Sequence, residues 1–67
     1  MSSVAKTIEL SAESPDGFED AVRVGIAKAG ETVHNIEAAY VKEQKVIVTG
    51  GQVTAFRVHI QITFVVD

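Results

Sequence analysis

Near its C-terminal end, this 67-residue sequence alternates apolar and polar residues without a break from Phe56 to Phe64. An alternation with a period of two is typical of a β-strand that buries one of its faces. The pattern predicts a single strand over about residues 52–66, about 50 Å long at about 3.3 Å per residue. Its apolar positions are Phe56, Val58, Ile60, Ile62, Phe64 and Val66, and its polar positions are Arg57, His59, Gln61 and Thr63.

Two further strands are predicted upstream. Residues from about 36 to 48 are rich in Val, Ile and Tyr, and they lead into Gly50 and Gly51. Two consecutive glycines can adopt the positive φ angles of a two-residue hairpin turn. Residues from about 4 to 11 also alternate between apolar and polar types. The sequence therefore predicts a long hairpin, 36–48 and 52–66, and a separate first strand.

One amphipathic helix is predicted between the first two strands, over about residues 15–29. Ser14 and Pro15 favour a helix start, because the serine oxygen can accept from the free amides and proline lacks the amide that would stay unpaired. Gly30 favours a stop in the left-handed conformation. Gly25, inside the helix, costs about 1 kcal/mol relative to alanine and indicates a close approach of the helix to the sheet or to another subunit. The apolar stripe consists of Phe18, Ala21, Val22, Ile26 and Ala29.

The predicted helix is too short to cover the predicted hairpin. A helix of about 15 residues is about 23 Å long, less than half the length of the last strand. Much of the apolar row of that strand would therefore be exposed to water in a monomer, and each large side chain left exposed forgoes about 1.5–3 kcal/mol. The chain has no cysteine, so disulfides cannot stabilise so small a domain. We expect self-association to provide the missing burial.

The composition argues against several functions. Nine acidic and six basic side chains give a net charge of −3 without a basic cluster, so no nucleic-acid binding is expected. No apolar run has the length of a signal peptide or a membrane span, so we expect a cytoplasmic protein without membrane association. The chain has no cysteine nucleophile, phosphate-binding loop, dinucleotide fingerprint or serine–histidine elbow, and we do not expect an enzyme.

The order strand, helix and long hairpin in so short a chain resembles the dodecin family. The resemblance implies an α+β fold of the β-α-β-β type, with a three-stranded antiparallel sheet wrapped around one helix and assembled as a hollow homododecamer. It also implies storage of a flavin (FMN, FAD or riboflavin) or a similar small ligand between subunits. Three segments carry it: Ser14-Pro15-Asp16-Gly17, Glu31-Thr32-Val33-His34-Asn35-Ile36, and Phe56-Arg57-Val58 through Thr63-Phe64.

The family's flavin pocket corresponds to Ala38, Lys45 and Arg57. In flavin-binding dodecins the second strand opens with a Leu-Asp-Trp-Phe-Glu-Val motif, and its tryptophan stacks on the flavin ring. Here Ala38 takes the place of that tryptophan. Lys45 replaces an arginine and keeps its positive charge, whereas Arg57 replaces a ring-binding glutamine and can only donate hydrogen bonds. Val65 replaces a further arginine.

The sequence leaves two alternative functions open. It also resembles a branch of the family that lacks the tryptophan and is associated with calcium, which implies a flavin-free assembly that binds divalent cations or has a structural role only. Metal ligands cannot be assigned, because one acidic cluster is already explained by the favourable charge at a helix start. A third interpretation is a module that docks a peptide at the edge of the first strand. The acidic cluster consists of Glu13, Asp16, Glu19 and Asp20.

Several single residues carry a second interpretation beside the structural one. Glu31, His34 and Glu37 are spaced by three and would form a metal site only on a helix, which the chain is leaving at that point. Tyr40 is two residues from Ala38 on the same strand face, where it packs in a core or interface or replaces the stacking platform. The polar row that includes His59 is solvated or lies between subunits, or else it lines a pocket.

Overall fold

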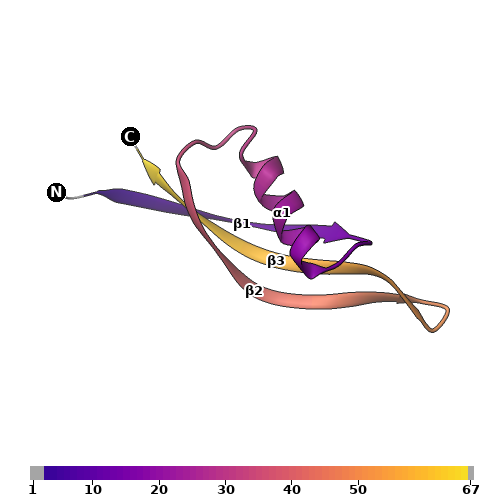
Figure 1. Cartoon of the computed structure of the whole chain (residues 1–67). Helices are drawn as coiled ribbons and strands as arrows, with labels where there is room; N and C mark the ends of the chain where they lie inside the picture. Colours follow the sequence, from indigo (N-terminus) through magenta and orange to yellow (C-terminus); the bar gives the residue numbers. More distant parts are fainter. Residues whose placement is uncertain (1–2, 67) are drawn as a thin grey trace.

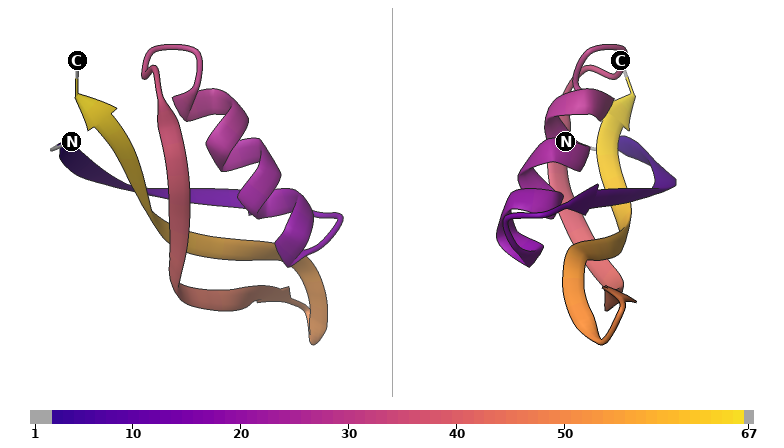
Figure 2. Two further views of the ribbon diagram at one scale, coloured as in Figure 1. Left: turned by 60° about the vertical axis from the view of Figure 1, so that its left-hand side comes forward. Right: turned by 90° about the vertical axis from the view of Figure 1, so that its right-hand side faces the viewer.

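The structure is a computed structural model that describes residues 3–66. Its elements are β1 (Val4–Ser14), α1 (Phe18–Ala29), β2 (Ile36–Thr49) and β3 (Gln52–Val66). The strands form one antiparallel sheet in the order β1-β3-β2, so the last strand of the chain is the central one. The sheet twists around α1 on one side (Figures 1 and 2). This confirms the predicted β-α-β-β fold with a three-stranded antiparallel sheet wrapped around one helix.

The hydrophobic core lies between α1 and the middle of β3. Val58, Ile60 and Ile62 are fully buried and alternate along the strand, which confirms that this parity faces the core. On the helix, Ala21 and Ala29 are buried against them. Small side chains at these points allow a helix of 12 residues to approach the sheet closely. Partly buried apolar residues surround this cluster: Ile8, Leu10, Ala12, Phe18, Val22, Ile26 and Ile36.

The connection from β1 to α1 differs from the prediction. β1 continues to Ser14, and α1 begins at Phe18 instead of near Pro15. The Ser14 hydroxyl does not cap the helix; it accepts a hydrogen bond from the Asp16 amide at 3.0 Å and donates one to the Asp20 carboxylate. Because Ser14 is still paired with the central strand and is 2% exposed, its side chain stabilises the turn before the helix instead.

The end of α1 also differs from the prediction. Gly30 follows the last helical residue, but its φ of −65° and ψ of −14° are right-handed, because its amide still donates to the Ile26 carbonyl at 2.9 Å. The left-handed residue of this connection is Asn35, with a φ of 62°, directly before β2. Within residues 3–66 no helix is long and apolar enough to cross a membrane.

The β2–β3 hairpin closes with the predicted turn. Thr49 pairs with Gln52, and between them Gly50 and Gly51 have φ angles of 59° and 78°. Positive φ at both central residues is the requirement of a type I′ turn, and glycine meets it without strain. The hairpin extends well beyond the helix in Figure 1, and the molecule measures 53 × 20 × 13 Å.

The exposed apolar side chains lie on a different strand from the one that the sequence predicted. We expected much of the apolar row of β3 to be uncovered, but β3 is the central strand and its middle is buried beneath α1. The uncovered residues belong mainly to the edge strand β2, which α1 hardly covers, and to the end of the hairpin. They include Tyr40, Val41, Val46, Val48 and Val53, between 38% and 66% exposed. The shortage of cover is therefore real, but it lies at β2.

Gly25 sets the distance between the helix and the sheet. A Cβ atom at this position would lie 3.0 Å from the Cβ of Ala12, 3.1 Å from Cδ1 of Ile60 and 3.2 Å from Cδ1 of Leu10. Two of these neighbours belong to β1 and one to β3, so the added atom would contact side chains of two adjacent strands. This confirms the close approach that the sequence indicated.

Gly25→Val should therefore destabilise the protein by about 2–3 kcal/mol, because the branched side chain must push α1 away from the sheet. Ala27→Val adds the same side chain on the exposed side of the same helix and should cost less than about 1 kcal/mol. Chemical unfolding at a fixed subunit concentration measures both variants. Equal stabilities would show that Gly25 does not set the helix–sheet distance.

Candidate ligand-binding site

The face of the sheet that points away from α1 is polar. It carries the residues that alternate with the core positions of β3, together with their partners across the ladders. We call it the polar face. From β1 it includes Glu9, Ser11 and Glu13, from β3 it includes Arg57, His59, Gln61 and Thr63, and from β2 it includes Ala38, Tyr40, Glu43 and Lys45.

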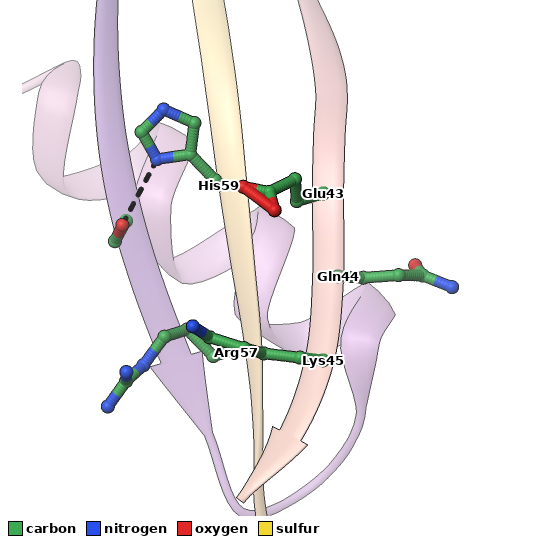
Figure 3. Close-up of a pocket in the computed structure, with 6 residues that line it drawn as sticks. Glu43, Gln44, Lys45, Arg57 and His59 are labelled. Atoms are coloured by element: carbon green, nitrogen blue, oxygen red, sulfur yellow. Dashed lines mark hydrogen bonds between the residues drawn. The ribbon is translucent and has the colours of Figure 1, made fainter.

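A hollow of about 250 Å³ lies on this face, and we call it the polar hollow. Lys45 and Arg57 are direct partners across the β2–β3 ladder, and both line it. Figure 3 shows the guanidinium of Arg57 directed toward β1, and the Gln44 side chain on the far side of β2. The residues that line the polar hollow are Ser11, Glu43, Gln44, Lys45, Arg57 and His59.

Irregularities in β2 decide which of its residues reach the polar face. Val41 pairs with Ile60 and Glu43 pairs with His59, so Lys42 is an extra residue that shifts the register. In a regular strand Ala38 and Lys45 would point to opposite faces, because they are an odd number of residues apart. The bulge reverses the alternation and puts Lys45 beside Arg57.

The structure brings together two of the three predicted site residues. Lys45 and Arg57 meet in the polar hollow, but Ala38 pairs with Thr63, six positions further along β3 and about 20 Å away at about 3.3 Å per residue. Tyr40 lies between them on the same face, opposite Gln61, and is 66% exposed, so it is not part of the protomer's core. A small ligand bound to one protomer could therefore not contact all three predicted positions.

Arg57 is held in place by a carboxylate. Its Nε and Nη2 atoms lie 2.9 Å and 2.8 Å from Oε1 of Glu13, which is its partner on the other side of β3. This pair draws the guanidinium toward β1. Lys45, by contrast, has no carboxylate partner among residues 3–66, so its ammonium group is free to bind an anion from outside the protomer.

A second network joins all three strands next to the polar hollow. Oε1 of Glu9 on β1 accepts hydrogen bonds from Nε2 of His59 at 2.8 Å and from Nζ of Lys42 at 3.1 Å. Oγ of Ser11 lies 3.2 Å from Nδ1 of the same imidazole. The pKa of Glu9 is lowered, first by the hydrogen bond from His59 and then by the hydrogen bond and charge of Lys42.

The other acidic constellations do not form a metal site within one protomer. No group of three or more His, Asp or Glu side chains in the described part of the chain could hold a metal ion. Glu31, His34 and Glu37 are therefore not brought together. The acidic residues near the helix start act separately, since Glu13 binds Arg57, Glu19 binds Arg23 at 2.7 Å and Asp20 accepts from Ser14.

Sequence reasoning missed three residues of the polar hollow: Ser11, Glu43 and Gln44. The signal for Ser11 is its place on the polar parity of β1, opposite His59. The two β2 residues gave no such signal, because their direction depends on the bulge at Lys42.

The fold is that of a small α+β domain with a polar face on a twisted sheet. A family model described as Dodecin matches residues 4–67. The chain belongs to the dodecin family. No curated protein sequence matches it closely enough to add to this assignment.

Solved dodecin structures share the fold over almost their whole length. Dodecin from Streptomyces davaonensis is 27% identical with a TM-score of 0.94, and the match covers 100% of this chain and 98% of that one. The tt0972 protein from Thermus thermophilus is 26% identical with a TM-score of 0.93, covering 98% and 97%. A calcium-chelating antigen of Mycobacterium tuberculosis, calcium dodecin, is 28% identical with a TM-score of 0.84, covering 97% and 93%.

Glu9→Gln should weaken the dependence of the protein's stability on pH in the acidic range. Because the pKa of Glu9 is lowered in the folded protein, its ionised carboxylate stabilises the fold at neutral pH, and this contribution is lost as the pH falls below about 4.5 toward the lowered value. The variant should be less stable than the wild type at pH 7, and the gap should close on acidification.

Unfolding midpoints between about pH 7 and about pH 3 measure this effect. Glu37→Gln is the matched control, because Glu37 has no ion-pair partner among residues 3–66. Parallel profiles of stability against pH for the wild type and Glu9→Gln would show that the ionised Glu9 carboxylate does not stabilise the fold.

Proposed function

We propose that this protein is a non-enzymatic, homo-oligomeric binding protein that sequesters a small ligand of the flavin class (FMN, FAD or riboflavin) between its subunits. The observation that carries the proposal is the division of the predicted site on a dodecin fold. Ala38 and the pair Lys45–Arg57 lie on one face but too far apart for one small ligand. An assembly in which two polar faces meet would let a ligand contact both ends of the site.

The uncovered edge of the sheet supports the oligomer. β2 exposes several large apolar side chains in the protomer, among them Tyr40, Val46 and Val48. Burying a side chain of this size contributes about 1.5–3 kcal/mol, so a few of them match the whole stability of a small domain. A homododecamer is the form that the family resemblance implies.

The side chains of the polar face favour a ligand that binds through charge as well as through ring stacking. Without a tryptophan, the ring stacking that contributes about 0.5–1.5 kcal/mol beyond burial is lost at Ala38. Lys45 offers a free positive charge, and the exposed ring of Tyr40 lies on the same face two residues from Ala38. A T. thermophilus dodecin variant with tryptophan replaced by phenylalanine has a TM-score of 0.92 with this chain, so the fold tolerates loss of a tryptophan.

A second candidate function is a flavin-free assembly that binds calcium or has a structural role. The likeness to the calcium dodecin of M. tuberculosis favours it. Calcium takes about six to eight oxygen ligands, and one protomer has no cluster of three or more candidate side chains within residues 3–66. The ligands would therefore come from several subunits or from backbone carbonyls. On either candidate, a cytoplasmic location stays a prediction.

Ala38→Trp should raise the affinity for riboflavin about tenfold, because the indole restores a stacking surface and buries more area at the predicted ring site. Quenching of riboflavin fluorescence in a titration measures the affinity. Glu37→Trp, which adds the same ring at the neighbouring position, is the control and should leave the affinity unchanged. If the Ala38→Trp variant binds riboflavin no better than the wild type, the proposed placement of the flavin ring is wrong.

The wild-type protein tests the second candidate function. The calcium function would be favoured if the wild type does not bind riboflavin at micromolar concentration and its melting temperature rises when calcium is added.

A further inference from the structure

His59 occupies the polar hollow among fixed charges that balance one another. Histidine is the side chain that ordinarily changes its charge between about pH 5 and pH 8. With a neutral imidazole, three carboxylates face three permanent cations on this part of the polar face, and α1 adds none because it lies on the other side of the sheet. The groups are Glu9 and Glu13 from β1, Lys42, Glu43 and Lys45 from β2, and Arg57 from β3.

The surroundings of His59 accept both protonation states without rearrangement. When neutral, its Nε2–H donates to Glu9 at 2.8 Å, and Nδ1 accepts from the Ser11 hydroxyl at 3.2 Å. When protonated, Nδ1–H donates to the same hydroxyl oxygen, which can accept as well as donate. Its side chain is 35% exposed, so protons can reach it from solvent. A change of charge therefore alters the field in the polar hollow while the contacts stay in place.

Two charges in the polar hollow have no partner among residues 3–66. Glu13 holds Arg57, and Glu9 holds Lys42, which leaves the ammonium of Lys45 and the carboxylate of Glu43. Glu43 is the direct cross-strand partner of His59, and Figure 3 shows its carboxylate extending over β3 toward the imidazole. A proton on His59 would thus offset the charge of Glu43 and leave Lys45 as the dominant free charge.

The geometry points to an oxyanion-binding site in the polar hollow that is switched on by protonation of His59. At higher pH the Glu43 carboxylate repels an anion from Lys45, and at lower pH the imidazolium cancels that repulsion. The ligand class is a small oxyanion or the phosphate group of a larger ligand. This deepens the proposed function, on which it rests for the identity of the site, by adding a preference for phosphate-bearing ligands and a dependence on pH.

Sulfate is the appropriate probe, because it keeps both negative charges through the pH range of the test. Its affinity for the wild-type oligomer, measured by calorimetry at low ionic strength, should be about three- to tenfold higher at about pH 5.5 than at about pH 8. His59→Gln should bind sulfate equally weakly at both pH values. His34→Gln removes the only other histidine, which does not line the polar hollow, and should behave like the wild type.

A second variant tests the same switch by removing the carboxylate charge of Glu43. Glu43→Gln removes the repulsion that protonation is inferred to offset, so it should bind sulfate at about pH 8 nearly as well as the wild type does at about pH 5.5. This keeps the inference testable if His59→Gln does not fold. A wild-type affinity that is the same at both pH values, or a pH dependence that survives in His59→Gln, would overturn the inference.

Riboflavin, which has no phosphate, separates this inference from the proposed function. Riboflavin bound at both pH values together with pH-independent sulfate binding would overturn the switch and leave the flavin proposal standing. Sulfate binding that depends on pH through His59, in a protein that does not bind riboflavin, would support the switch and contradict the flavin proposal.

Discussion

The structure depends on the fact that its one helix is too short to cover its sheet. The helix has 12 residues, whereas the central strand of the sheet has 15 residues and the molecule is 53 Å long. Because a helix rises about 1.5 Å per residue and a strand about 3.3 Å, α1 can bury only the middle of β3. Ile60 and Ile62 are fully buried there, whereas β2 carries exposed valines and Tyr40. The protomer therefore has one closed core and one apolar edge that another copy can cover.

The polar face follows from the same arrangement. Since the helix occupies one side of the sheet, the other side is free to carry charge, and the β1–β3 ladder places Glu13 of β1 opposite Arg57 of β3. The irregular register of β2 then turns Lys45 toward Arg57 and leaves Ala38 far along the same face. In the proposed oligomer, contacts between subunits would complete a ligand site that is divided in this way, so the assembly would have a functional as well as a structural role.

The sequence predicted the elements whose signal is local and periodic. The period of two gave the buried face of β3, the Gly50–Gly51 pair gave the turn, and Gly25 gave the close approach of helix and sheet. It failed where tertiary pairing overrides a local preference. Ser14 has the chemistry of a helix cap but is paired with the central strand, and the bulge at Lys42 depends on the partner strand and leaves no mark in the alternation. The candidate site was therefore predicted in part: the family resemblance supplied Lys45 and Arg57, but not Ser11, Glu43 and Gln44, which also line the polar hollow.

The central claim is that this chain is stable only when copies of it cover the exposed edge of β2. The mass of the purified protein by light scattering, at micromolar subunit concentration, tests it most directly. We predict a single closed particle of many subunits, with twelve copies of the 7.2 kDa chain as the expected number. A stable, folded particle of about 7.2 kDa at the same concentration would contradict the account.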